Sequence, residues 1–197
     1  MTPPPLSSRL ARLLPGSGRG IPELPPPVRE ALDLTAHEKV LAAARDTDTG
    51  AWLIATTYAV ALVDPSAVTE GGRLAVTWRR PWHEVDRASW ERESSLLTVS
   101  WAGPAQERAT RPSQWRLGED ALFLQVLRER VQASVVLAQE LRLAGRRTGR
   151  AVIRQDLATG DLLEQVVLGR GVRDDAETEA AATVALVWLR EQVGMSA

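Results

Sequence analysis

Two histidines, His37 and His83, are the side chains of this 197-residue chain that could act as a general base near neutral pH. No G-x-S-x-G sequence is present to supply a nucleophile for either of them. Glu84 follows His83 directly, but neighbouring residues on a strand point to opposite faces. We therefore expect partly exposed histidines and no enzyme. An enzyme would need a deep pocket that holds His37 or His83 beside a buried carboxylate.

Metal and phosphate chemistry have little support in the sequence. The chain has no cysteine, and two histidines with scattered acids are too few for a metal site. Residues 46–50, Asp-Thr-Asp-Thr-Gly, resemble the start of a calcium loop, but the later ligands are absent, so a turn is predicted. The glycine-rich residues 16–20 follow no strand and open no helix, which predicts a linker. We expect neither a cofactor nor a metal.

Arginine side chains offer a second kind of chemistry, the binding of anions. The net charge of −1 gives no overall attraction to nucleic acid or to an anionic membrane. The densest basic cluster could still contact an anionic lipid or a nucleic acid, and it comprises Arg142, Arg146, Arg147, Arg150 and Arg154. Lys39 is the only lysine, so arginines carry nearly all of the positive charge and their clustering is weaker evidence for phosphate binding.

The central region that would position these residues is a series of short strands. Six of the seven tryptophans lie between Trp52 and Trp115, mostly at positions that point inward, and we expect them in the core. The predicted strands are 39–45, 51–63, 73–80, 83–92, 96–101 and 106–111. The run 51–63 is long and should break near Thr57. The odd spacing of the inward candidates Val85 and Ala88 predicts a bulge between them.

The polar strand 106–111 is the candidate edge for a partner, through Gln106, Arg108 and Thr110. After it the apolar spacing becomes helical. The positions that carry this spacing are Leu124, Leu127, Val131, Val135, Ala138 and Leu141. They predict one long amphipathic helix from Glu119 to Leu143.

The C-terminal residues predict a hairpin followed by a helix. Strands 150–156 and 162–168 flank a turn, and the last helix should run to about Val193 and stop at Gly194. On that helix four residues share a face, namely Ala180, Val184, Val187 and Trp188. The hairpin could extend the preceding sheet, or the helix could pack on another copy, which would give a homo-oligomer.

The N-terminal residues 1–27 contain eight of the twelve prolines, so a disordered or irregular tail is predicted. Within it, Ser7–Leu14 could form one or two helical turns, with four leucines on one face, namely Leu6, Leu10, Leu13 and Leu14. No apolar run approaches the roughly 20 residues of a membrane span, and no stretch has signal-peptide character. We expect a cytoplasmic protein.

Three segments resemble bacterial PH-like domains of actinobacterial type, which are similar to GRAM domains. They are His37–Ala44 (HEKVLAAA), Trp52–Thr57 (WLIATT) and Pro81–Trp90 (PWHEVDRASW), and the resemblance covers about residues 34–143. It implies about seven strands closed by a helix. Relatives that bind phosphoinositides carry basic residues between the first two strands. Here that loop, Arg45–Gly50, has one arginine and two aspartates.

Together these patterns predict an α+β fold: a PH-like β-barrel or sandwich of about seven antiparallel strands capped by a long helix, plus a β-hairpin-helix extension. The expected divisions are a proline-rich tail at 1–30, a PH-like domain at 34–144 and the extension at 145–197. The expected function is a non-catalytic intracellular module that binds a protein or peptide. The alternatives are anionic-lipid or nucleic-acid binding through the arginines of 142–154, and an enzyme.

Overall fold

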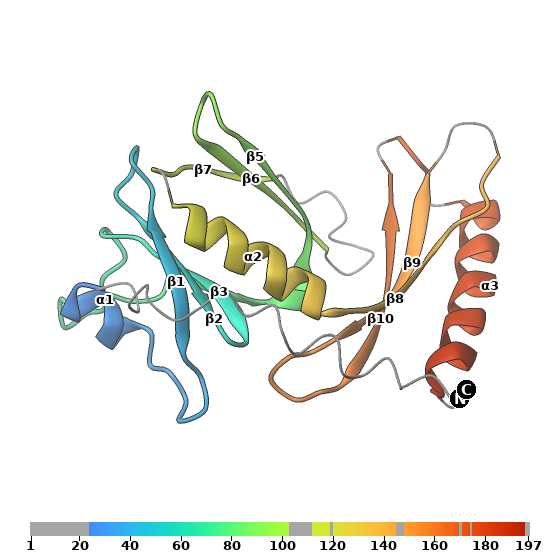
Figure 1. Ribbon diagram of the computed structural model, residues 1–197, viewed down its shortest axis with the longest axis horizontal. Coiled ribbons are helices and arrows are strands. Elements are labelled where there is room, and N and C mark those ends of the chain that lie inside the picture. Colours follow the sequence, from blue (N-terminus) through green and yellow to red (C-terminus); the bar gives the residue numbers. More distant parts are fainter. Residues whose placement is uncertain are drawn as a thin grey trace, which may run out of the picture.

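The computed structural model describes residues 24–102, 112–118, 120–144, 148–169, 171–173 and 175–195. These residues form three antiparallel sheets and three α-helices, which confirms the predicted α+β class (Figure 1). Two sheets and helix α2 make up one half of the molecule, and the third sheet with helix α3 makes up the other. The sheets do not close into a barrel. Among the described residues, no helix is long and apolar enough to cross a membrane.

The first sheet consists of four strands that pair in chain order. They are β1 (Val40–Arg45), β2 (Trp52–Thr56), β3 (Ala59–Val63) and β4 (Trp78–Pro81). The predicted break near Thr57 is confirmed, because this residue lies in the turn between β2 and β3. The predicted turn at 46–50 is also confirmed, and it ends at Gly50 with a positive φ of 77°. Strand β4 is shorter than the predicted strand 73–80.

Helix α1 (Pro26–Ala31) covers the outer side of this first sheet. Leu24, Val28 and Leu32 are buried in one cluster with Ile54, Ala61 and Val63. These apolar contacts hold in place the segment between α1 and β1, which carries His37 and Glu38.

The second sheet consists of β5 (Val85–Glu91), β6 (Leu96–Trp101) and β7 (Ser113–Arg116), in the order β5-β6-β7. A register shift between Val85 and Arg87 confirms the predicted bulge. The prediction that Ala88 points inward is wrong, since it is exposed. The short helix η3 (Trp82–Glu84) stands where the start of a longer strand was expected. The predicted edge strand 106–111 lies outside the described residues.

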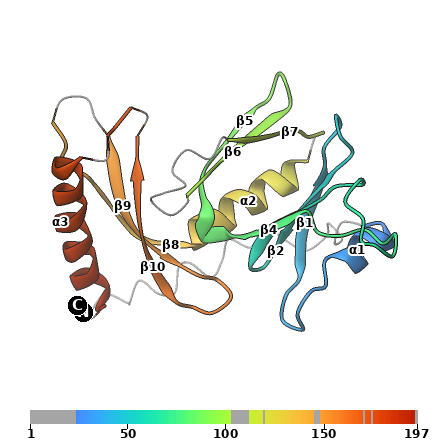
Figure 2. The same cartoon turned by 180° about the vertical axis from the view of Figure 1, so that it is seen from behind.

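Helix α2 (Ala121–Ala133) crosses the space between the two sheets, as Figures 1 and 2 show. It buries Phe123, Val126 and Leu127. The prediction of one helix from Glu119 to Leu143 is wrong, because the helix ends at Ala133 and strand β8 (Val135–Glu140) begins. β8 pairs with a later strand, and this long-range pairing outweighs the helical spacing of its apolar residues.

Five tryptophans belong to the core enclosed by the two sheets and α2. Trp82 and Trp115 are buried, and Trp78, Trp90 and Trp101 are partly buried in the same cluster. Trp78 meets Trp101 edge to face, with ring centroids 5.4 Å apart. The expectation that these tryptophans form a core is confirmed, whereas Trp188, outside the predicted strands, is exposed.

The C-terminal half contains the predicted hairpin and helix. Strands β9 (Gly149–Gln155) and β10 (Leu162–Leu168) form the hairpin, and β8 adds a third strand in the order β10-β9-β8. Helix α3 (Ala176–Val193) packs on β9 and β8. Asp175 caps its first turn by accepting a hydrogen bond from the backbone N–H of Thr178. Gly194, with a φ of 71°, ends it as predicted.

Candidate functional site

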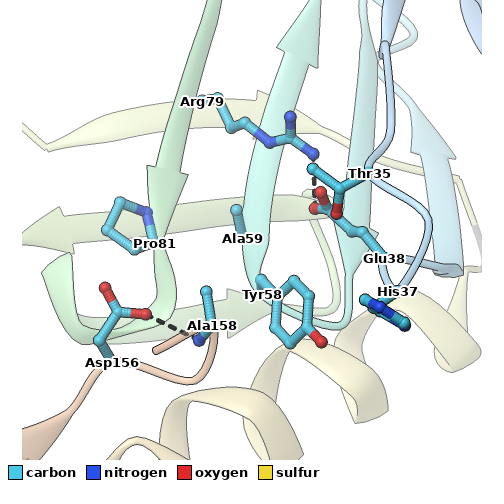
Figure 3. Close-up of a pocket in the computed structure, with 9 residues that line it drawn as sticks. All are labelled: Thr35, His37, Glu38, Tyr58, Ala59, Arg79, Pro81, Asp156 and Ala158. Atoms are coloured by element: carbon cyan, nitrogen blue, oxygen red, sulfur yellow. Dashed lines mark hydrogen bonds and ion pairs between the residues drawn. The ribbon is translucent and has the colours of Figure 1, made fainter. Parts of the chain in front are cut away.

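A cavity of about 420 Å³ lies at one end of the first sheet (Figure 3). Three parts of the chain contribute to it: the segment before β1, the strands β3 and β4 with the preceding turn, and the loop after β9. The lining residues are Thr35, His37, Glu38, Tyr58, Ala59, Arg79, Pro81, Asp156 and Ala158. Because the last two belong to the C-terminal half, the cavity is complete only where the two halves meet.

Glu38 is a buried carboxylate whose position is fixed by two partners. The hydroxyl of Thr56 donates a hydrogen bond to its Oε1 over 2.5 Å, and Nη2 of Arg79 forms an ion pair with the same oxygen at 2.5 Å. The hydroxyl of Thr56 also accepts a hydrogen bond from the N–H of Ala59 at 2.9 Å. The β2–β3 turn therefore holds the carboxylate, and Arg79 neutralises its charge.

Tyr58 and His37 supply polar groups without internal partners. Tyr58 sits in the β2–β3 turn and is half-buried, whereas His37 is exposed. Within the part of the chain that the structure describes, the Tyr58 hydroxyl and the His37 ring form no hydrogen bond. A tyrosine offers one donor with acceptor capacity, and a neutral histidine offers one donor and one acceptor. These groups are free to bind a ligand that enters the cavity.

His83 lies beside the cavity and does not line it. Its Nδ1 is 3.8 Å from Oδ2 of Asp156, which is too long for a hydrogen bond. The other oxygen of Asp156 accepts a hydrogen bond from the N–H of Ala158 at 2.7 Å. The carbonyl of His83 accepts one from Gln165 at 2.9 Å. The backbone of His83 thus joins the two halves.

The cavity does not combine the groups that general acid–base catalysis requires. His37 shares it with the buried Glu38, but that carboxylate is occupied by Thr56 and Arg79. None of the described lining residues is a nucleophile hydrogen-bonded to a base. Among the described residues, no group of three potential metal ligands is close enough to hold an ion. The chemistry that this geometry supports is recognition of a polar group.

The predicted arginine cluster does not form one surface. Arg154 is only 1% exposed, and it donates to the hydroxyl of Ser134 at 2.8 Å and to the carbonyl of Val85 at 2.9 Å. Burial lowers the pKa of Arg154, nearby Arg150 lowers it further, and Asp86 opposes the shift. Arg150 forms an ion pair with Asp86. Both side chains therefore serve the junction between the halves.

The structure describes only one of the remaining predicted site residues. Arg142 is exposed, while Arg146 and Arg147 lie outside the described residues. The predicted partner edge, Gln106, Arg108 and Thr110, also lies outside them. These parts of the prediction stay predictions.

A second cavity, of about 720 Å³, lies between α1 and the loop before β4. Its lining includes Glu30, Arg73, Leu74 and Val76. Its lining comes from α1 and the loop between β3 and β4 and shares no residue with the first cavity, so it provides a natural control for experiments on that cavity.

Comparison with protein-family models and with curated proteins found no match to this chain. The function of the chain is therefore inferred from its geometry.

Proposed function

We propose that the chain is a non-catalytic PH-like interaction module that binds a protein or peptide partner. The PH-like part of the proposal is supported by the element order. Four strands in one sheet and three in another are followed by α2, which contacts β1, β2 and β5. This is the order expected from the resemblance of residues 34–143, and modules of this kind take peptides in grooves or along sheet edges.

The observation that carries the proposal is the cavity with a neutralised interior and free polar groups at its mouth. Glu38 and Arg79 cancel each other's charge, which favours a neutral polar ligand group over a strongly charged one. Tyr58 and His37 offer hydrogen bonds, and Ala59, Pro81 and Ala158 supply apolar contact. The volume of about 420 Å³ suits one or two side chains of a partner. The partner anchors such a side chain in the cavity.

Peptide display provides the test. A random-peptide library is selected on the full-length chain, and the binding of selected peptides is measured by calorimetry. We expect Tyr58→Ala to weaken binding by about tenfold or more, because a half-buried aromatic anchor would be lost. His37→Ala should weaken it less. Arg73→Ala, in the second cavity, is the matched control and should leave binding unchanged.

Two results would contradict the proposal. One is that the selected peptides bind Tyr58→Ala as tightly as the unmutated chain, and the other is that the library yields no binder. Thermal melting of each variant establishes that the loss is not due to unfolding.

A further inference from the structure

The buried carboxylate of Glu38 has one oxygen that the fold does not use. Its side chain is only 4% exposed, yet Thr56 and Arg79 both contact the same oxygen, Oε1. Among the residues that the structure describes, none forms a hydrogen bond with Oε2. Buried polar groups are normally satisfied, and a carboxylate can accept hydrogen bonds on both of its oxygens. Oε2 is therefore an acceptor without a donor in the wall of the first cavity.

The first cavity places a hydrogen-bond donor near this acceptor. Figure 3 shows the Glu38 carboxylate between Arg79 and Tyr58, all three of which line the cavity. The hydroxyl of Tyr58 can donate as well as accept. A group that enters the cavity thus meets an acceptor at Glu38 and a donor at Tyr58. A ligand group satisfies both only when it contains a donor and an acceptor of its own.

The charges of the cavity favour a neutral group of this kind. The described lining contains two carboxylates, Glu38 and Asp156, and one guanidinium, that of Arg79. An incoming carboxylate would meet two like charges, and the Arg79 cation near them is already paired with Glu38. An incoming cation would lose its hydration next to Arg79. A neutral group avoids both costs.

We infer that the first cavity binds the side-chain primary amide of a glutamine or asparagine of the partner. The amide N–H donates to Oε2 of Glu38, and the amide carbonyl accepts from the hydroxyl of Tyr58. The apolar part of the same side chain lies against Ala59 and Pro81. A hydrogen bond to a carboxylate is charge-assisted and stronger than a neutral one, so the amide provides the discrimination. This inference rests on the proposed function, since it names the group that the cavity recognises.

Peptides selected on the full-length chain test the inference at pH 7. In each peptide, the anchor is the residue whose replacement by alanine abolishes the difference in affinity between the unmutated chain and Tyr58→Ala. We expect a glutamine or asparagine at this position. Each peptide is then made with glutamine, methionine or glutamate as its anchor, and the affinities are measured by calorimetry. Methionine resembles glutamine in shape but lacks the amide, so it should bind about tenfold or more weakly. Glutamate should bind more weakly still, because the cavity repels its charge.

Glu38→Gln separates recognition from stability. This variant removes the charge that rejects a glutamate anchor, so the preference for glutamine over glutamate should fall by about tenfold or more. The preference is a ratio of two affinities for one variant, so a general weakening of binding leaves it unchanged. Glu30→Gln, the same substitution in the second cavity, is the matched control and should keep the full preference. The peptide series on the unmutated chain decides the question even if Glu38→Gln does not fold.

Three results would overturn the inference and leave the proposed function in place. They are a charged or wholly apolar anchor in peptides that still depend on Tyr58, a glutamate anchor that binds as tightly as glutamine, and a Glu38→Gln chain that keeps the full preference. A library that yields no binder would overturn the proposed function and this inference together.

Discussion

Helices α2 and α3 each cover a sheet, but they present different surfaces to solvent. The outward residues of α2 include Gln125, Arg128 and Glu129, whereas those of α3 include Val184 and Trp188. The helix in the first half closes a core and nothing more. The helix in the second half closes a core and offers an apolar stripe as well. A helix thus closes a core in each half, and in the C-terminal half it also exposes large apolar side chains.

The two halves also have separate buried clusters, which are joined by polar contacts and by Leu157 of the C-terminal half, a residue that packs against the cluster of the first half. The buried residues of the main cluster in the first half run from Ala42 to Leu127, and those of the C-terminal cluster run from Leu141 to Leu189. Between them lie the hydrogen bonds of Arg154 and the ion pair of Arg150 with Asp86. Such contacts depend on direction, so they fix the relative position of the halves and thereby the shape of the cavity.

The strongest way to disturb this arrangement is Arg154→Ala. The substitution leaves the carbonyl of Val85 and the hydroxyl of Ser134 without their partner and opens a void in a buried junction. We expect the free energy of unfolding to fall by about 3 kcal/mol. Urea denaturation measures it. Arg142→Ala, at an exposed arginine, is the control and should change stability by less than about 0.5 kcal/mol. Equal effects of the two would mean that the junction does not depend on Arg154.

Thr56→Val tests the first half alone. It removes the hydroxyl that bonds Glu38 and the N–H of Ala59 while keeping the shape of the side chain. Because both groups are buried, we expect a loss of about 2 kcal/mol by urea denaturation. Thr35→Val, at an exposed threonine of the same cavity, should be nearly neutral. A neutral Thr56→Val would show that the Glu38 carboxylate is held by Arg79 without help from the turn.

Gly194→Ala tests the end of α3. Gly194 has a φ of 71°, and an alanine there is strained. The expected loss is about 1 kcal/mol, measured by thermal or urea unfolding. Gly118→Ala is the matched control, because this glycine lacks a positive φ and a Cβ there meets open space. If both glycines tolerate alanine equally, the C-terminal turn is not needed to end the helix.

The smallest effect is expected at the start of α2. Burial raises the pKa of Asp120 above its usual 3.8, so the folded state holds the proton more tightly than the unfolded chain. Any stability linked to this group is present below pH 3.8 and is lost as the pH rises through the raised value. Asp120→Asn should therefore be more stable at pH 7 by less than about 1 kcal/mol, since the side chain is only partly buried. The difference should vanish near pH 3, and a less stable variant at pH 7 would contradict the assignment.

Local rules predicted the elements whose boundaries are set by neighbouring residues. The turn at 46–50, the break at Thr57, the bulge after Val85 and the end of α3 at Gly194 all follow from short-range preferences. The end of α2 does not. The apolar spacing continues through Val135, and only pairing with β9, whose paired residues lie ten to nineteen positions later, makes this stretch a strand.

The candidate site could not be predicted for a related reason. Glu38, Thr56 and Arg79 meet from three separate segments, and Asp156 joins them from the other half. No motif connects these positions. The sequence also makes Arg154 look like a surface cation, because nothing near it in the sequence reveals that the first half covers that side of β9.

Site-specific photo-crosslinking tests the proposed role of the first cavity most directly. A photoreactive phenylalanine analogue replaces Tyr58 in one version of the full-length chain and Arg73, in the second cavity, in another, and crosslinked products are identified by mass spectrometry. We predict that position 58 links to a different protein or to a selected peptide, and that position 73 does not. The absence of any partner at position 58, or equal crosslinking from both positions, would contradict the proposed role of the cavity.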